Sequence, residues 1–209
     1  MGDYLVQLLC EFVFYLPFLA VLLLCAYFFN KKQGVKVPRL HIVGCFGFVF
    51  YLSAVLSITA SLTLQDLIRY NFSIQGSVGL IPFSSISLFG FALNTALFVP
   101  LGFLIPLLFQ GKNKLSIVAA HGFLFSLCIE ASQLFKLRAA DVDDLIANTL
   151  GTVLGFALYK LLLGRKDHSA LWMPGQNTYT KTEPFILIAA VFILRFLIYP
   201  LIVNTLWAT

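Results

Sequence analysis

A cluster of acidic and amide side chains, with one arginine, lies between residues 130 and 148 of a chain that is otherwise mostly apolar. Its members are Glu130, Gln133, Arg138, Asp141, Asp143, Asp144 and Asn148. Carboxylates can act as general bases or as oxygen ligands of a hard divalent cation. Polar groups of this kind are costly in a membrane and usually mark a functional site there. This cluster is therefore the first candidate for a site.

Several chemistries are open to the cluster. Glu130 or Asp144 could serve as a general base if burial raises its pKa. A divalent cation could be held by the aspartates Asp141, Asp143 and Asp144, but the residues do not name a cofactor. A polar ligand could instead be bound by Asn94, Gln133, Arg138, Asp141, Asn148 and Arg195.

A structural interpretation competes with these chemistries. The three aspartates could cap the helix that follows them and pair with Lys136 and Arg138 in a solvated loop. This interpretation fits Glu130, Gln133 and Asn148 less well, because polar groups in the interior of a membrane protein are expensive to bury.

Composition indicates a membrane protein. Of the 209 residues, 60% are hydrophobic and 11% are charged, whereas about 25% of the residues in a soluble domain are charged. The mean hydropathy is +0.93. The sequence lacks the alternating segments of about ten residues that a β-barrel needs. We therefore expect an all-α, polytopic transmembrane bundle that forms one domain over residues 1–209, and the net charge of +5 reflects loop asymmetry and not nucleic-acid binding.

The cysteines and histidines do not predict a second site. The four cysteines lie in apolar runs without paired spacing, which is typical of small buried hydrophobic residues. His41 and His168 lie at the boundaries of apolar segments, and His121 is expected to pack between helices.

Six segments are long and apolar enough to span a membrane, which takes about 20 residues. They are Tyr4–Phe29, Leu40–Thr63, Asn94–Gln110, Ser116–Phe135, Asp144–Leu163 and Pro184–Trp207. The segment Leu64–Phe91 is expected to be external and irregular. Its start could form a short interfacial helix, and Ile81–Phe91 could re-enter the bilayer if protein covers its backbone.

The distribution of basic residues predicts the orientation. The loops that follow the first, third and fifth spans hold ten Lys and Arg residues, and the opposite side holds Arg69, Lys136 and Arg138. Basic loops stay in the cytoplasm. We therefore expect a multi-pass protein of the cell membrane whose two termini and polar cluster face the outside.

Helical spacing predicts how the cluster converges. Asp141, Asp144, Asn148, Gly151 and Gly155 share one stripe, since residues three and four apart lie on one helix face. The matching stripe of the preceding span is Gly122, Ser126, Glu130 and Gln133. The short loop makes these spans antiparallel neighbours, so Glu130 and Gln133 should face Asp144 and Asn148 in a polar pocket. Arg195 in the last span is expected to face the bundle and could pair with Glu130.

Ordered motifs run through the middle of the chain. They are Ile81-Pro82-Phe83, Asn94-x-x-x-Phe98-x-Pro100-x-Gly102-x-x-x-Pro106, and Glu130-x-x-Gln133 continued by Arg138-x-x-Asp141-x-Asp143-Asp144-x-x-x-Asn148-x-x-Gly151-x-x-x-Gly155. Over residues 40–163 the chain resembles the VanZ-like family, bacterial membrane proteins named for a teicoplanin-resistance protein. The resemblance implies a cell-envelope role that is often linked to lipoglycopeptide tolerance. The family's polar positions correspond to Asn94, Glu130, Gln133, Arg138, Asp141, Asp144 and Asn148.

Three functional hypotheses follow. The first is an envelope protein that binds or handles an outer-leaflet lipid or a lipid-linked cell-wall precursor through the polar pocket and so contributes to teicoplanin tolerance. The second is a membrane enzyme, metal-dependent or not, in which Glu130 or Asp144 acts on a phosphate- or acyl-bearing lipid. The third is a scaffold whose polar cluster only fixes the register of its helices.

Overall fold

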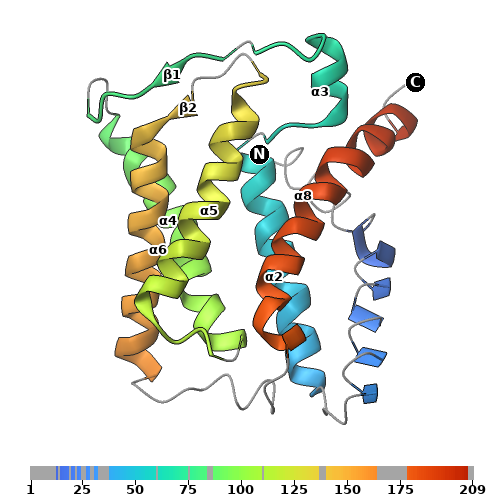
Figure 1. Ribbon diagram of the computed structural model, residues 1–209, viewed down its shortest axis with the longest axis vertical. Helices are drawn as coiled ribbons and strands as arrows, with labels where there is room; N and C mark the ends of the chain where they lie inside the picture. Colours follow the sequence, from blue (N-terminus) through green and yellow to red (C-terminus); the bar gives the residue numbers. More distant parts are fainter. Residues whose placement is uncertain are drawn as a thin grey trace.

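The computed structural model describes residues 38–59, 61–74, 76–83, 87–109, 111–136, 140–163 and 178–206, together with scattered positions between 13 and 32. Its long helices are α2 (Arg39–Ile58), α4 (Leu88–Leu108), α5 (Leu115–Gln133), α6 (Val142–Leu163) and α8 (Thr178–Leu206). The short helix α3 (Leu64–Arg69) and two-residue strands β1 (Val78–Gly79) and β2 (Ala140–Asp141) lie at one end of the bundle, at the top of Figure 1.

Four of the predicted spans correspond to helices that are long and apolar enough to cross a membrane, namely α2, α4, α5 and α6. Helix α4 begins at Leu88, earlier than the predicted Asn94, because the Ser87 side chain caps it by accepting a hydrogen bond from the Gly90 N–H. Helix α8 covers the predicted sixth span up to Leu206, since Trp207 lies outside the described residues, but it is not among these four. The predicted first span, Tyr4–Phe29, falls largely outside the described residues, so the count of six spans stays a prediction.

The segment between α2 and α4 contains the short helix that the sequence predicts. Thr63 and Asp66 form a capping box at the start of α3, in which each side chain accepts a hydrogen bond from the other residue's N–H. The expected re-entrant segment, Ile81–Phe91, is not confirmed. Its last four residues form the first turn of α4, and residues 84–86 lie outside the described part of the chain.

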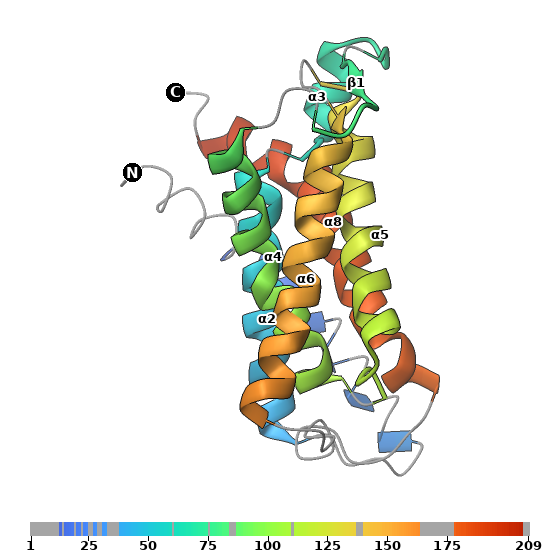
Figure 2. The same ribbon diagram turned by 90° about the vertical axis from the view of Figure 1, so that its left-hand side faces the viewer.

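Helix α6 lies between α4 and α5 (Figure 2), and glycines bring it very close to α4. A methyl group placed on Gly155 would overlap the carbonyl oxygen of Val99, and one on Gly151 would overlap that of Thr95. From the α4 side, a methyl group on Gly102 would overlap the carbonyl oxygen of Thr152. The predicted small-residue packing of Gly151 and Gly155 is confirmed, and the partner helix is α4.

Aromatic side chains fill the interior between the helices. Phe98 of α4 lies 5.6 Å from Phe125 of α5, ring centre to ring centre, and both are buried. Phe125 in turn lies 5.5 Å from Phe192 of α8 in an edge-to-face contact. These contacts fix the spacing of α4, α5 and α8 around a common core.

Candidate functional site

The predicted polar cluster lies at the end of the bundle that we call the polar cap, which is made of α3, residues 76–83, residues 140–144 and the last turn of α5. Strands β1 and β2 pair in parallel there, with Val78 opposite Ala140 and Gly79 opposite Asp141. The Gly76 N–H also donates to the carbonyl oxygen of Leu134 at 2.9 Å. The cap therefore joins segments about 60 residues apart along the chain (Figure 1).

Glu130 holds the start of α6 against the end of α5. Its Oε2 accepts a hydrogen bond from the Asp141 backbone N–H at 3.0 Å, and the Glu130 side chain is buried. Asp141 Oδ1 accepts in turn from the Asp143 N–H at 3.0 Å. The two helices are thus antiparallel neighbours joined through carboxylates, as the sequence predicts.

Asp143 anchors the segment before α4. Both oxygens of its buried carboxylate accept a hydrogen bond from the Phe83 backbone N–H, at distances of 2.8 and 3.1 Å from the nitrogen. Asp143 also lies in the first turn of α6, where the helix dipole favours a negative charge. The sequence suggested two roles for this residue, as a metal ligand or as a cap of the helix that follows, and its place in the first turn of α6 agrees with the second. The Ile81-Pro82-Phe83 motif was the sequence feature that could have indicated this contact, but the sequence did not show which residue the motif contacts.

The remaining amides and carboxylates form hydrogen bonds with different parts of the bundle. Asp144 Oδ1 accepts from Asn94 Nδ2 of α4 at 2.6 Å, and Asn148 Nδ2 donates to Ser126 Oγ of α5 at 2.8 Å. Gln133 Nε2 donates to the carbonyl oxygen of Thr59, just after α2, at 3.2 Å. These hydrogen bonds correct the expectation that Glu130 and Gln133 face Asp144 and Asn148. Asp144, Gly151 and Gly155 face α4, whereas Asn148, which the sequence places on the same stripe, faces Ser126 of α5 as that stripe predicts.

The three aspartates proposed as metal ligands accept hydrogen bonds from separate donors. Asp141 accepts from the Asp143 N–H in the first turn of α6, Asp143 from the Phe83 N–H, and Asp144 from Asn94 Nδ2. Their metal-binding role stays a prediction. The predicted ligand-binding roles of the two arginines also stay predictions. Arg138 lies outside the described residues. Arg195 is buried on α8, and its predicted pairing with Glu130 is untested.

Lys136 pairs with Asp66 of α3, with 3.1 Å between Nζ and Oδ2, instead of the aspartates of residues 141–144. Burial raises the pKa of Asp66, but hydrogen bonds from Thr63 and the charge of Lys136 outweigh that effect and lower it below the ordinary value. The ion pair ties α3 to the end of α5.

This pair predicts a pH dependence. Because the Asp66 pKa is lower in the folded protein, the stabilisation is fully present above the ordinary pKa and is lost as pH falls through the folded value. Asp66→Asn should lower the free energy of unfolding by no more than about 1 kcal/mol at neutral pH, since water screens the pair. Thermal unfolding in detergent should show this difference at about pH 5 and above and lose it progressively as the pH falls below 3.8, the ordinary pKa of the carboxyl, and through the lower pKa of the folded protein. A difference that persists in acid would contradict the assignment.

A second prediction concerns Asp143 and how firmly it holds residues 78–83 of the polar cap in place. Asp143→Ala should destabilise the protein by about 2 kcal/mol, because it leaves the Phe83 N–H without its acceptor. Amide exchange of residues 78–83 should accelerate at least about tenfold, since about 1.4 kcal/mol corresponds to a factor of ten. Asp143→Asn keeps one acceptor oxygen and is the matched control, with a smaller effect. Unchanged exchange in Asp143→Ala would show that the contact does not hold this segment.

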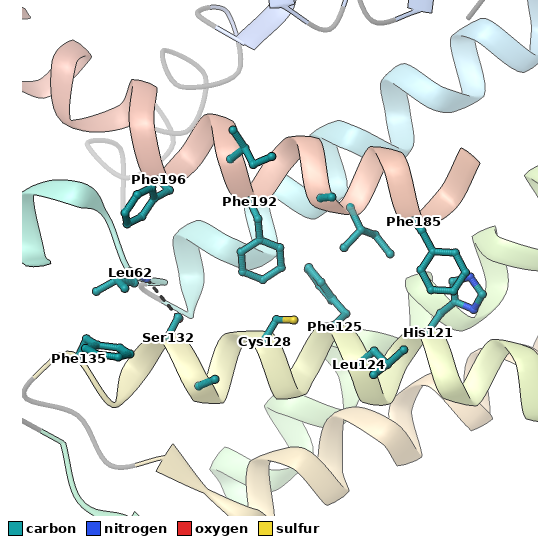
Figure 3. A pocket seen from close by; sticks show the side chains of 14 residues that line it. Leu62, His121, Leu124, Phe125, Cys128, Ser132, Phe135, Phe185, Phe192 and Phe196 are labelled. Carbon is teal, nitrogen blue, oxygen red and sulfur yellow. Dashed lines mark hydrogen bonds between the residues drawn. The ribbon is translucent and has the colours of Figure 1, made fainter. Parts of the chain in front are cut away.

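A second feature is an apolar groove of about 820 Å³ between α5 and α8 (Figure 3), which sequence reasoning missed because α8 carries no motif. At one end the Leu62 N–H donates to Ser132 Oγ at 3.3 Å. At the other end His121 stacks on Phe185 with 4.1 Å between ring centres. Aromatic and aliphatic side chains line the wall between these ends, among them Phe125, Phe135, Ile188, Phe192 and Phe196.

Comparison with known proteins identifies the family. A family model described as VanZ/LLP1 matches residues 48–163, more than half of the chain. The chain belongs to the VanZ/LLP1 family. No curated protein and no solved structure matches it.

The VanZ/LLP1 match covers α4, α5, α6 and both strands, and therefore the whole described polar cap. It confirms the predicted resemblance to VanZ-like proteins. Together with the four apolar helices, it supports the prediction that this is a membrane protein. The matched region ends before α8, so the family region supplies Leu62 and the α5 side of the groove but not the α8 side.

Proposed function

We propose that this VanZ-family protein binds a membrane lipid or a lipid-linked cell-wall precursor. The apolar chain of the ligand occupies the groove between α5 and α8, and its headgroup meets the polar cap on the outer side of the membrane. The observation that carries the proposal is the groove itself, whose volume of about 820 Å³ lies in the range typical of ligand sites, roughly 300–1,000 Å³.

The chemistry of the groove favours an acyl or prenyl chain as occupant. Its lining is apolar and partly open, since the lining residues Leu124 and Ile193 are exposed. Each Å² of apolar surface removed from water contributes roughly 25 cal/mol, so an aqueous ligand without a hydrocarbon chain would gain little there. In a bilayer the hydrocarbon chains of lipids lie beside exposed apolar helix faces of this kind, so a lipid would enter the groove sideways from the membrane.

The polar cap lies at the Ser132 end of the groove. Phe135 lines the groove and is followed by Lys136, and Leu62 lines it and is followed by the capping residue Thr63. The Lys136–Asp66 pair therefore stands where the headgroup of a bound lipid would emerge. In this proposal Glu130 and Asp143 act by holding residues 76–83 and 140–144 in place.

For a cell, the proposal predicts tolerance of glycopeptides such as teicoplanin. A lipid-linked precursor held by the protein is less accessible to a drug that must bind it at the membrane surface. This step rests on the family's link with lipoglycopeptide tolerance as well as on the groove.

The test is lipid retention. The protein is purified in mild detergent, and the lipids that remain bound are identified by native mass spectrometry. Wild type should retain about one lipid per chain, and Ala189→Phe, which fills the groove, should retain at least about tenfold less. Ala157→Phe on the exposed face of α6, outside the groove, is the matched control and should behave as wild type.

Equal retention by all three proteins would overturn the proposal. A chemically altered lipid whose formation is abolished by Glu130→Gln, with folding intact, would instead establish the enzymatic alternative.

A further inference from the structure

Three metal-donor side chains meet at the end of the bundle opposite the polar cap. His41 and Cys45 lie four residues apart on one face of α2, and Glu183 of α8 faces them. The exposed fractions of the three residues are 1%, 0% and 3%. Neither the family match nor the proposed lipid site includes His41, Cys45 or Glu183.

The three donor atoms have the spacing of a metal site. His41 Nε2 lies 3.0 Å from Glu183 Oε1, Cys45 Sγ lies 3.4 Å from His41 Nε2, and Cys45 Sγ lies 3.9 Å from Glu183 Oε1. A triangle with these sides has a point about 2.0 Å from all three corners, and zinc bonds to nitrogen, oxygen and sulfur measure about 2.0–2.3 Å. An ion slightly out of the plane of the triangle would therefore bind all three donors with little movement of the side chains.

The type of donor selects the class of ion. A thiolate, an imidazole and a carboxylate suit zinc and its neighbours in the transition series, whereas magnesium and calcium prefer oxygen alone. Charge agrees with this choice, because an ionised Cys45 and an ionised Glu183 together balance a divalent cation, and buried charges need such compensation. Apolar rings cover the site: Phe109 lies edge-to-face with His41 at 6.1 Å and with Phe48 at 5.3 Å.

We propose that His41, Cys45 and Glu183 bind a zinc-class divalent cation that clamps α2 to α8. A fourth position is left for water or another donor, since three protein ligands do not complete a tetrahedral site. The competing arrangement is a metal-free His41–Glu183 ion pair beside a thiol. The proposal is independent of the lipid site, so either can fail alone.

The test uses the full-length protein in detergent. After metal is stripped with a chelator and zinc is restored, elemental analysis should find one tightly held zinc per chain. Cobalt in place of zinc should give the visible absorption of a tetrahedral ion and a near-ultraviolet charge-transfer band from the Cys45 thiolate. Wild-type protein that holds no zinc above the buffer background would overturn the proposal without any variant.

Cys45→Ser is the discriminating variant, because it keeps the His41–Glu183 pair and therefore the packing of α2 on α8. It should lose the charge-transfer band and weaken zinc binding by more than about tenfold. Cys128→Ser, which changes the exposed cysteine of α5, is the matched control and should keep the band and the affinity. A band that survives Cys45→Ser and disappears in Cys128→Ser would overturn the assignment.

Discussion

Gly155→Ala is expected to prevent stable packing of α6 on α4. The added methyl group would overlap the carbonyl oxygen of Val99 and lie 2.9 Å from the backbone nitrogen of Phe103. Both are main-chain atoms of a helix, so they cannot turn aside as the end of a side chain would. Overpacking commonly costs about 1–3 kcal/mol, and we expect about 3 kcal/mol or more here. Thermal unfolding in detergent and the monodisperse fraction after size exclusion would measure the loss.

Gly47→Ala on α2 is the matched control for this prediction. Nothing lies within 4 Å of a methyl group placed there, so the same change should leave stability unchanged or raise it slightly, because alanine favours helix over glycine by about 1 kcal/mol. If Gly155→Ala unfolds at the same temperature as Gly47→Ala, then α4 and α6 do not pack as closely as described.

Ala189→Phe is expected to abolish the proposed contribution of the protein to teicoplanin tolerance. The phenylalanine ring would occupy space between α5 and α8 that the proposal assigns to a hydrocarbon chain. Losing the site should reduce tolerance to that of cells without the protein. The measurement is the minimal inhibitory concentration of teicoplanin in a susceptible host that makes equal amounts of wild-type or variant protein.

Ala157→Phe should leave that concentration unchanged, because it adds the same ring to an exposed position outside the groove. The opposite pattern, with tolerance lost in Ala157→Phe and kept in Ala189→Phe, would contradict a role for the groove.

Hydropathy and helical period predicted the parts of the fold that depend on local sequence. The helices α5 and α6 begin and end within two residues of the predicted spans, because each is an apolar run bounded by polar residues, whereas α2 begins near its predicted start but ends at Ile58, five residues before the predicted Thr63. The short loop before α6 also predicted that α5 and α6 are antiparallel neighbours, and the Asp141 N–H donates to Glu130 at that junction.

Contacts between distant segments could not be predicted in the same way. Asp144 was expected to face α5, but the glycine stripe of α6 packs on α4 and takes Asp144 to Asn94, 50 residues away. Helical spacing shows which residues share a face, but it does not show which helix that face meets. The hydrogen bond between Asp143 and the Phe83 N–H could not be predicted for the same reason.

The meeting of His41, Cys45 and Glu183 illustrates this limit most clearly. Each residue alone was ordinary: a histidine and a glutamate at span boundaries and a cysteine in an apolar run. Glu183 is 142 residues from His41, and only the packing of α8 on α2 brings them together. The one available signal was the spacing of His41 and Cys45, four residues apart on a helix.

Photo-crosslinking tests the central claim most directly, because it reports where a lipid lies. The protein would be reconstituted with a phospholipid that carries a photoreactive group near the middle of one acyl chain, and the labelled peptides would be identified by mass spectrometry. We predict labels on the facing residues of the groove, in particular Phe125, Cys128 and Ile188. Labels spread evenly over the exposed faces of α4 and α6, with none enriched in the groove, would contradict the proposal that a lipid chain occupies the groove between α5 and α8.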